Sequence, residues 1–116
     1  MPAPDEPARL PPRDRYVRAV LSLYRTTPGV LGRIRNADRT LAAQLYDKGI
    51  PLYVMANAFI VAAARRVRHN ALSTSLPPIR SLHYFLDVVR ELLERPLGPH
   101  DIDELRRVLG LADPPP

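Results

Sequence analysis

The 116-residue sequence contains no cysteine and no tryptophan, and its aromatic residues are five tyrosines and two phenylalanines. Without cysteine the chain forms no disulfide bond and no thiolate metal site, which fits a protein of the reducing cytoplasm. Because aromatic side chains are scarce, leucine, valine, isoleucine and alanine must fill most of the core. A chain of this length has room for one domain.

Long apolar runs are also missing. The longest run, from Ile50 to Ala64, covers about 15 residues and includes Asn57, whereas about 20 apolar residues are needed to cross a bilayer. This run therefore predicts a buried helix. The first seven residues contain three prolines and two acids, and they lack the apolar stretch of a secretory signal peptide. We expect a cytoplasmic protein that does not associate with the membrane.

Proline, in contrast, is abundant and marks the expected ends of the folded part. Five of the fourteen prolines lie in the first twelve residues, and three close the sequence. These segments have few large apolar side chains, so they gain too little from burial to offset the entropy lost on ordering. We predict disordered tails at residues 1–12 and 112–116, and a single helical domain at residues 13–111.

Apolar residues at helical spacing predict five helices, with proline and glycine between them. The expected ranges are residues 14–25, a segment that starts at Asn36 or Asp38 and ends before Gly49, and residues 51–69, 79–94 and 99–109. The third is apolar on two faces, which is typical of a central helix, and Phe59 lies at its middle. We expect Tyr46, Leu52 and Leu93 to be buried. The predicted fold class is all-α, a compact bundle of four to five helices with short loops.

The basic residues are almost all arginine, and they are concentrated in the middle of the chain. Only one of the seventeen is lysine. Residues 30–80 hold eight bases and two acids, whereas residues 81–116 hold four bases and seven acids. The planar guanidinium binds phosphate or carboxylate through two hydrogen bonds, so this pattern indicates an anionic partner. A GC-rich genome also produces arginine-rich surfaces, so composition alone leaves both explanations open.

Two groups of cations are candidates for contact with a phosphate backbone. One group occupies a loop and the start of the second helix. The other lies at the end of the third helix, and the first residues of the fourth helix are expected beside it. The predicted nucleic-acid-binding residues are Arg33, Arg35, Arg39, Arg65, Arg66, Arg68, His69 and Arg80.

The patterns that catalysis requires are incomplete. The five glycines are scattered at helix ends, where capping explains them, and they form no phosphate-binding loop. Among the three histidines, His100 has two acids within helical reach, Asp103 and Glu104, and these lie on a short exposed helix. The segment 80–84 has residue types found in tyrosine recombinases, but the further basic residues of such sites are missing. We therefore predict no enzyme, no cofactor and no metal site.

Residues 38 to about 90 carry a series of short motifs. These are Asp38-Arg39-Thr40-Leu41-Ala42, Leu45-Tyr46, Gly49-Ile50-Pro51-Leu52, Ala58-Phe59, Ala63-Ala64-Arg65-Arg66 and Ile79-Arg80-Ser81-Leu82-His83-Tyr84-Phe85. The series resembles the C-terminal helical domain of DnaD-like replication-initiation proteins. It is also similar to small helical proteins of mobile elements that carry an arginine-rich block. The resemblance implies a DNA-associated accessory role in replication or in the mobility of a genetic element.

Two other functions fit the same sequence. The basic side of the domain could dock an acidic protein partner, which would make the chain an interaction adaptor. Alternatively, the chain could be a small helical subunit of a nucleoprotein complex of the CRISPR type. The sequence leaves open whether the nucleic acid is DNA or RNA, which protein partner belongs to a larger complex, and how many copies assemble.

Overall fold

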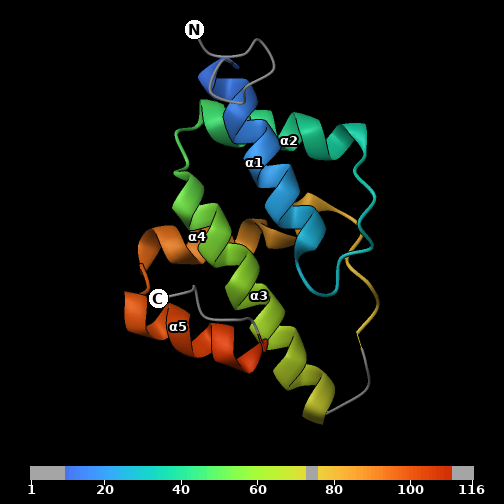
Figure 1. Cartoon of the computed structure of the whole chain (residues 1–116), viewed down its shortest axis with the longest axis vertical. Coiled ribbons are helices and arrows are strands. Elements are labelled where there is room, and N and C mark those ends of the chain that lie inside the picture. The colour runs from blue at the N-terminus through green and yellow to red at the C-terminus, as the bar shows by residue number, and fades with distance from the viewer. Residues whose placement is uncertain (1–9, 73–75, 111–116) are drawn as a thin grey trace, which may run out of the picture.

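The structure is a computed structural model that describes residues 10–72 and 76–110, and within them it is built from helices (Figure 1). Helix α1 spans Pro12–Thr26, α2 spans Asn36–Asp47 and α3 spans Leu52–Leu72. A short 3₁₀ helix, η2, spans Leu82–Phe85 and continues directly into α4 at Leu86–Glu94. Helix α5 spans Pro99–Val108. The predicted all-α bundle of four to five helices is confirmed.

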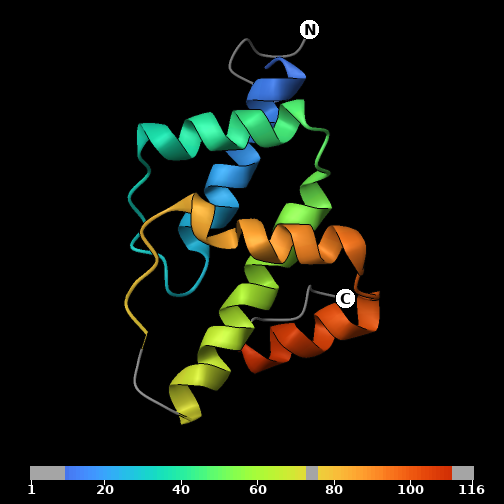
Figure 2. The same ribbon diagram turned by 180° about the vertical axis from the view of Figure 1, so that it is seen from behind.

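Helix α3 runs along the length of the domain, and the other helices are arranged around it (Figures 1 and 2). Helices α1 and α2 lie against each other near the beginning of α3, while α4 and α5 pack against α3 on another side. The predicted central position of the third helix is therefore correct. Its alanine-rich middle allows this close approach, because Ala58, Ala62, Ala63 and Ala64 are all buried.

The scarce aromatic residues meet in the core. Phe59 of α3 contacts Phe85 of η2 edge to face, with ring centroids 4.8 Å apart and ring planes at 84°. Tyr24 of α1 lies 6.0 Å from Phe85 and 6.4 Å from Phe59. The three rings thus join three separate elements in geometries that aromatic pairs prefer.

Three side chains that we expected in the core are partly exposed. Tyr46 is 37 % exposed, Leu52 38 % and Leu93 46 %. Leu52 is the first residue of α3, and Tyr46 and Leu93 are each the last but one of their helices. Sequence periodicity identifies an apolar face but does not show how much of its width a partner covers.

The predicted fourth helix begins later than expected. Ile79 is extended and pairs with Val30 in an isolated parallel bridge. The helical segment starts only at Leu82, where the Ser81 hydroxyl accepts a hydrogen bond from the His83 amide at 3.1 Å. Pro77 and Pro78 supply no amide hydrogen and favour extended backbone just before this point.

The remaining boundaries lie close to the predicted ones. Helix α1 starts at Pro12, which we expected in the tail, and α3 continues three residues beyond His69. Residues 1–9 and 111–116, which include most of both predicted tails, lie outside the described part of the chain. In the part that is described, no helix has both the length and the apolar character needed to cross a membrane.

Truncating Phe59 should destabilise the domain strongly, because its ring is 3 % exposed and links the three helical elements. We expect Phe59→Ala to cost about 3–5 kcal/mol. In a domain of this size that loss lowers the melting temperature by at least about 12 °C. The control is Tyr53→Ala, also on α3 but 67 % exposed, which should melt nearly like the parent protein. Equal melting temperatures for both variants would contradict the central position of Phe59.

Candidate nucleic-acid interface

Two extended segments carry part of the predicted site and lie side by side. We call residues 27–35, between α1 and α2, and residues 76–81, before η2, the loop pair. The Ile79 amide donates to the Gly29 carbonyl at 2.7 Å, and the Leu31 amide donates to the Ile79 carbonyl at 3.1 Å. The Arg35 guanidinium also donates to the Arg80 carbonyl. The sequence predicts Arg80 beside the end of the third helix, whereas the structure shows it in contact with Arg35.

A buried carboxylate fixes the start of α2 against the start of η2. Asp38 is fully buried, and its Oδ2 accepts a hydrogen bond from the Arg35 amide at 2.9 Å. Its Oδ1 accepts one from the amide of Leu82, also at 2.9 Å, across 44 residues of sequence. Both amides lie at helix starts, where they lack a carbonyl partner within their own helix. Asp38 therefore sets the position of Arg35 and Arg39 relative to Arg80.

Arg66 supports the loop pair from inside the domain. Its side chain is buried, and its Nη2 donates to the Pro77 carbonyl at 2.7 Å while Nη1 donates to the Tyr84 hydroxyl at 3.3 Å. Gly29 has a φ of +95°, and a Cβ at this residue would lie 2.9 Å from Nε of Arg66. The predicted site residue Arg66 is buried and already binds two protein oxygens, so its guanidinium is not accessible to a nucleic acid.

The other predicted cations of α3 have different surroundings. Arg65 forms a two-pronged ion pair with Glu91 of α4, with nitrogen–oxygen distances of 2.9 and 2.5 Å. This hydrogen bonding raises the pKa of Arg65 and lowers the pKa of Glu91. Arg68 is exposed and lines a cavity of about 290 Å³ together with Arg65 and Arg95, and His69 is exposed nearby in sequence. The predicted cluster at the end of α3 is therefore divided among a paired, a buried and two exposed side chains.

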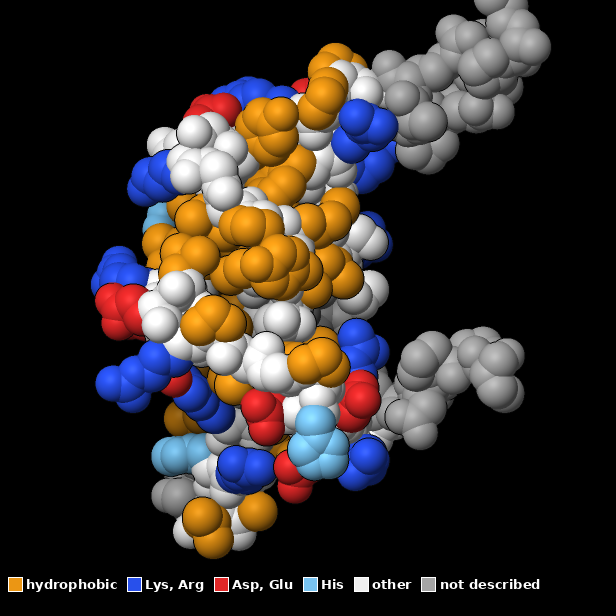
Figure 3. Space-filling view, turned by 90° about the vertical axis from the view of Figure 1, so that its left-hand side faces the viewer, with side chains coloured by type: hydrophobic (Ala, Val, Ile, Leu, Met, Phe, Trp, Pro, Cys, Tyr) orange, Lys and Arg blue, Asp and Glu red, His pale blue; other side chains and the backbone are white. Residues whose placement is uncertain are grey.

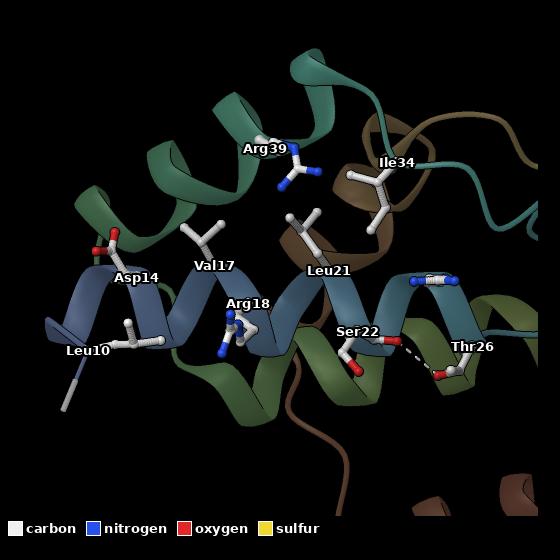
Figure 4. A pocket seen from close by; sticks show the side chains of 10 residues that line it. Leu10, Asp14, Val17, Arg18, Leu21, Ser22, Thr26, Ile34 and Arg39 are labelled. Carbon is white, nitrogen blue, oxygen red and sulfur yellow. Dashed lines mark hydrogen bonds between the residues drawn. The ribbon is translucent and has the colours of Figure 1, made fainter. Parts of the chain in front are cut away.

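A groove between α1 and α2 has a volume of about 760 Å³. Figure 4 shows Val17 and Leu21 pointing from α1 toward α2, while Ile34 and Arg39 point back toward α1. Arg18 lies over α1 in this view and does not point toward α2. Arg25 also lines this α1–α2 groove, and Asp14 and Leu10 lie toward the beginning of α1.

Three arginine side chains thus line one groove. Arg18, Arg25 and Arg39 take part in no ion pair among the residues that the structure describes. The predicted residue Arg39 is one of them, but Arg18 and Arg25 were missed. Their signal is present in the sequence: Arg15, Arg18, Ser22 and Arg25 follow i, i+3, i+7, i+10 spacing, which places them on one side of a helix. Arg18 and Arg25 lie before residues 30–80, the segment with the highest net positive charge, from which the binding residues were predicted.

Among the residues that the structure describes, no three histidine or acidic side chains come close enough to hold a metal ion. The group of His100, Asp103 and Glu104 lies on α5, and all three side chains are exposed.

Replacing Asp38 by asparagine tests how the site is held together. The amide oxygen can still accept one of the two hydrogen bonds, but the amide nitrogen then lies against the other backbone donor. We expect Asp38→Asn to lower the free energy of unfolding by about 2–3 kcal/mol, measured by urea denaturation. The control Asp103→Asn makes the same chemical change at an exposed position of α5 and should unfold like the parent. Unchanged stability in both variants would show that the buried carboxylate is not needed.

No protein-family model, curated protein or solved structure matches the chain. The resemblance of residues 38–90 to DnaD-like domains therefore stays a prediction from sequence motifs. The function has to be inferred from the site itself.

Proposed function

We propose that this protein is a non-enzymatic, nucleic-acid-binding accessory protein that holds a phosphate backbone on arginine side chains of α1, α2 and the loop pair. One observation carries the proposal: three guanidinium groups from two helices line one open groove and have no ion-pair partner among the described residues. Unpaired arginines that share a groove are suited to phosphate, which each can bind through two hydrogen bonds. The arginine surface consists of Arg18, Arg25, Arg33, Arg35, Arg39 and Arg80.

The spacing of these residues suits a nucleic-acid strand. Arg18 and Arg25 are separated by seven residues, or about 10.5 Å along the helix axis at 1.5 Å per residue. Three base steps of a DNA strand cover about 10 Å, at 3.4 Å per step. The two arginines can therefore contact phosphates three steps apart. Arg39 lies on the α2 side of the groove, and the exposed residues Arg35 and Arg80 are joined by the hydrogen bond from the Arg35 guanidinium to the Arg80 carbonyl.

The arginines near the end of α3 support phosphate binding less well. There Glu91 already neutralises Arg65 through two hydrogen bonds, and the acids of α4 and α5 lie in the same part of the sequence. A nucleic acid would have to displace Glu91 and would meet repulsion from the remaining carboxylates. The α1–α2 groove contains one carboxylate, Asp14, against three arginines.

The protein-docking alternative has its own support in a different face of the domain. Figure 3 shows apolar side chains forming a broad band between charged regions. Tyr53 and Leu93, which are 67 % and 46 % exposed, line one groove of the described residues, and exposed Leu23 lines another. Exposed apolar patches mark protein contacts more often than nucleic-acid contacts. This face fits a protein partner in a larger cytoplasmic complex, for replication or mobility of a genetic element, while the arginine surface stays accessible.

Binding of a labelled DNA duplex over a series of salt concentrations tests the proposal. The parent should bind at about 100 mM salt, with an affinity that falls steeply as salt rises. The triple variant Arg18→Gln, Arg25→Gln, Arg39→Gln should bind more weakly. Its plot of log affinity against log salt should be shallower by about three units, one for each lost contact. Glutamine keeps a good helix propensity, so folding should survive.

The control is the triple variant Arg65→Gln, Arg68→Gln, Arg95→Gln, which removes the same charge from the region near Glu91. It should keep the salt dependence of the parent. If the control loses the slope instead, the interface lies at the end of α3. If the parent binds neither duplex nor single strands, the protein does not act on nucleic acid, and the adaptor function takes its place.

A further inference from the structure

Two features of the α1–α2 groove have no role in binding phosphates. Its floor is apolar, formed by Val17, Leu21 and Ile34. One end holds the carboxylate of Asp14, which would repel a phosphate. Leu21 is 5 % exposed, so the surface that a ligand could touch belongs mainly to the half-buried Val17 and Ile34. A ligand that carries an uncharged, partly apolar group beside its phosphates would match both features.

The apolar floor is out of reach of a double helix. In a duplex the bases are stacked inside, and the outer surface that meets a protein groove is phosphate and sugar. In a single strand the bases can turn outward and cover apolar or planar protein groups. The groove volume of about 760 Å³ lies in the range of sites that enclose a small organic molecule, so it has space for a base and its sugar.

The arginines can serve both parts of such a ligand. Arg39 extends from α2 over the groove toward Val17 and Leu21 (Figure 4). A guanidinium in this position can stack on the face of a base that rests on the floor. Arg18 and Arg25, on the α1 side, remain available for phosphates of the same strand about three steps apart, on either side of that base.

Asp14 can distinguish bases by the hydrogen-bond donors on their edges. A carboxylate accepts hydrogen bonds, and cytosine, adenine and guanine each carry an exocyclic amino group that donates them. Thymine and uracil have no such group, and their one edge donor, N3–H, lies between two carbonyl oxygens that repel a carboxylate. Asp14 is exposed and forms no ion pair within the described residues, so its oxygens are available for this contact.

We infer that the α1–α2 groove binds one unpaired base of a single-stranded nucleic acid, with its amino-bearing edge at Asp14, its face against Arg39, and phosphates of the same strand on Arg18 and Arg25. The inference rests on the proposed function and narrows it to a class of ligand. Phosphate contacts then supply the affinity, while the floor selects single strands and Asp14 selects the base.

Equilibrium binding of four labelled probes tests this site: single-stranded 12-mers of deoxycytidine, deoxyadenosine and deoxythymidine, and a 12-base-pair duplex. At equal salt the parent should bind the cytidine and adenosine strands at least about fivefold more tightly than the thymidine strand. The duplex should bind more weakly than the cytidine strand. Asp14→Ala should weaken binding of the cytidine strand and strengthen binding of the thymidine strand, because it removes both a base acceptor and a negative charge.

The control Asp103→Ala removes the same charge from α5, far along the sequence from the groove, and should keep the preference of the parent. Ile34→Thr shortens the apolar floor and should weaken the single strands while leaving the duplex affinity nearly unchanged. Its melting temperature is measured alongside to show that it folds.

Three outcomes would overturn the inference. Two of them remove the base site alone, and the third also removes the proposed function. Equal binding of all four probes, with Asp14→Ala strengthening all of them equally, would leave phosphate binding intact and remove the base site. Tightest binding of the duplex would do the same. Binding of a glutamate 12-mer through the same arginines, with no binding of any oligonucleotide, would overturn the proposed function as well and favour an acidic protein partner.

Discussion

The carboxylate of Asp38 is the contact on which the arrangement of the arginine surface depends. It is fully buried, and it accepts hydrogen bonds from backbone amides at the starts of two helices that are distant in sequence. A buried charge is tolerated when such donors surround it, because they replace the water it has lost. The loop pair and Arg66 then complete the connection, since Arg66 donates to the Pro77 carbonyl beneath the segment that carries Arg80. Residues from three separate parts of the chain are thereby held on one side of the domain.

The two regions of arginine differ in how their charge is compensated. Near the end of α3, Arg65 is paired with Glu91, so part of the charge is used for the contact between α3 and α4. Around the α1–α2 groove, by contrast, Arg13 pairs with Asp47 at one end while Arg18, Arg25 and Arg39 have no acidic partner in the described chain. An exposed ion pair adds little stability, but it does remove a cation from the set that can attract a ligand. Charge compensation, more than the number of arginines, distinguishes the candidate interface from the rest of the surface.

Helical periodicity was sufficient to predict the all-α fold, the central third helix and the burial of Phe59, because these depend on which side chains are apolar. The isolated bridge between Val30 and Ile79 could not be predicted, since it joins two extended segments of different loops. The same limit applies to the site. Arg65 and Arg66 are adjacent in sequence and both look like surface cations, yet one faces Glu91 and the other faces the interior beside Tyr84. Neighbouring positions on a helix point about 100° apart, so adjacent residues of one type have different partners. The arginine stripe of α1 (Arg15, Arg18 and Arg25), in contrast, could have been predicted from its helical spacing.

Nuclear magnetic resonance mapping of an oligonucleotide on the intact protein tests the central claim most directly. Backbone amide shifts would be followed while an unlabelled cytidine 12-mer is added to the parent protein. The account predicts that the largest changes lie in residues 14–26 and 33–39, with smaller ones around Arg80. Changes confined to the end of α3 and to α4, or no changes at all at about 100 mM salt, would contradict it.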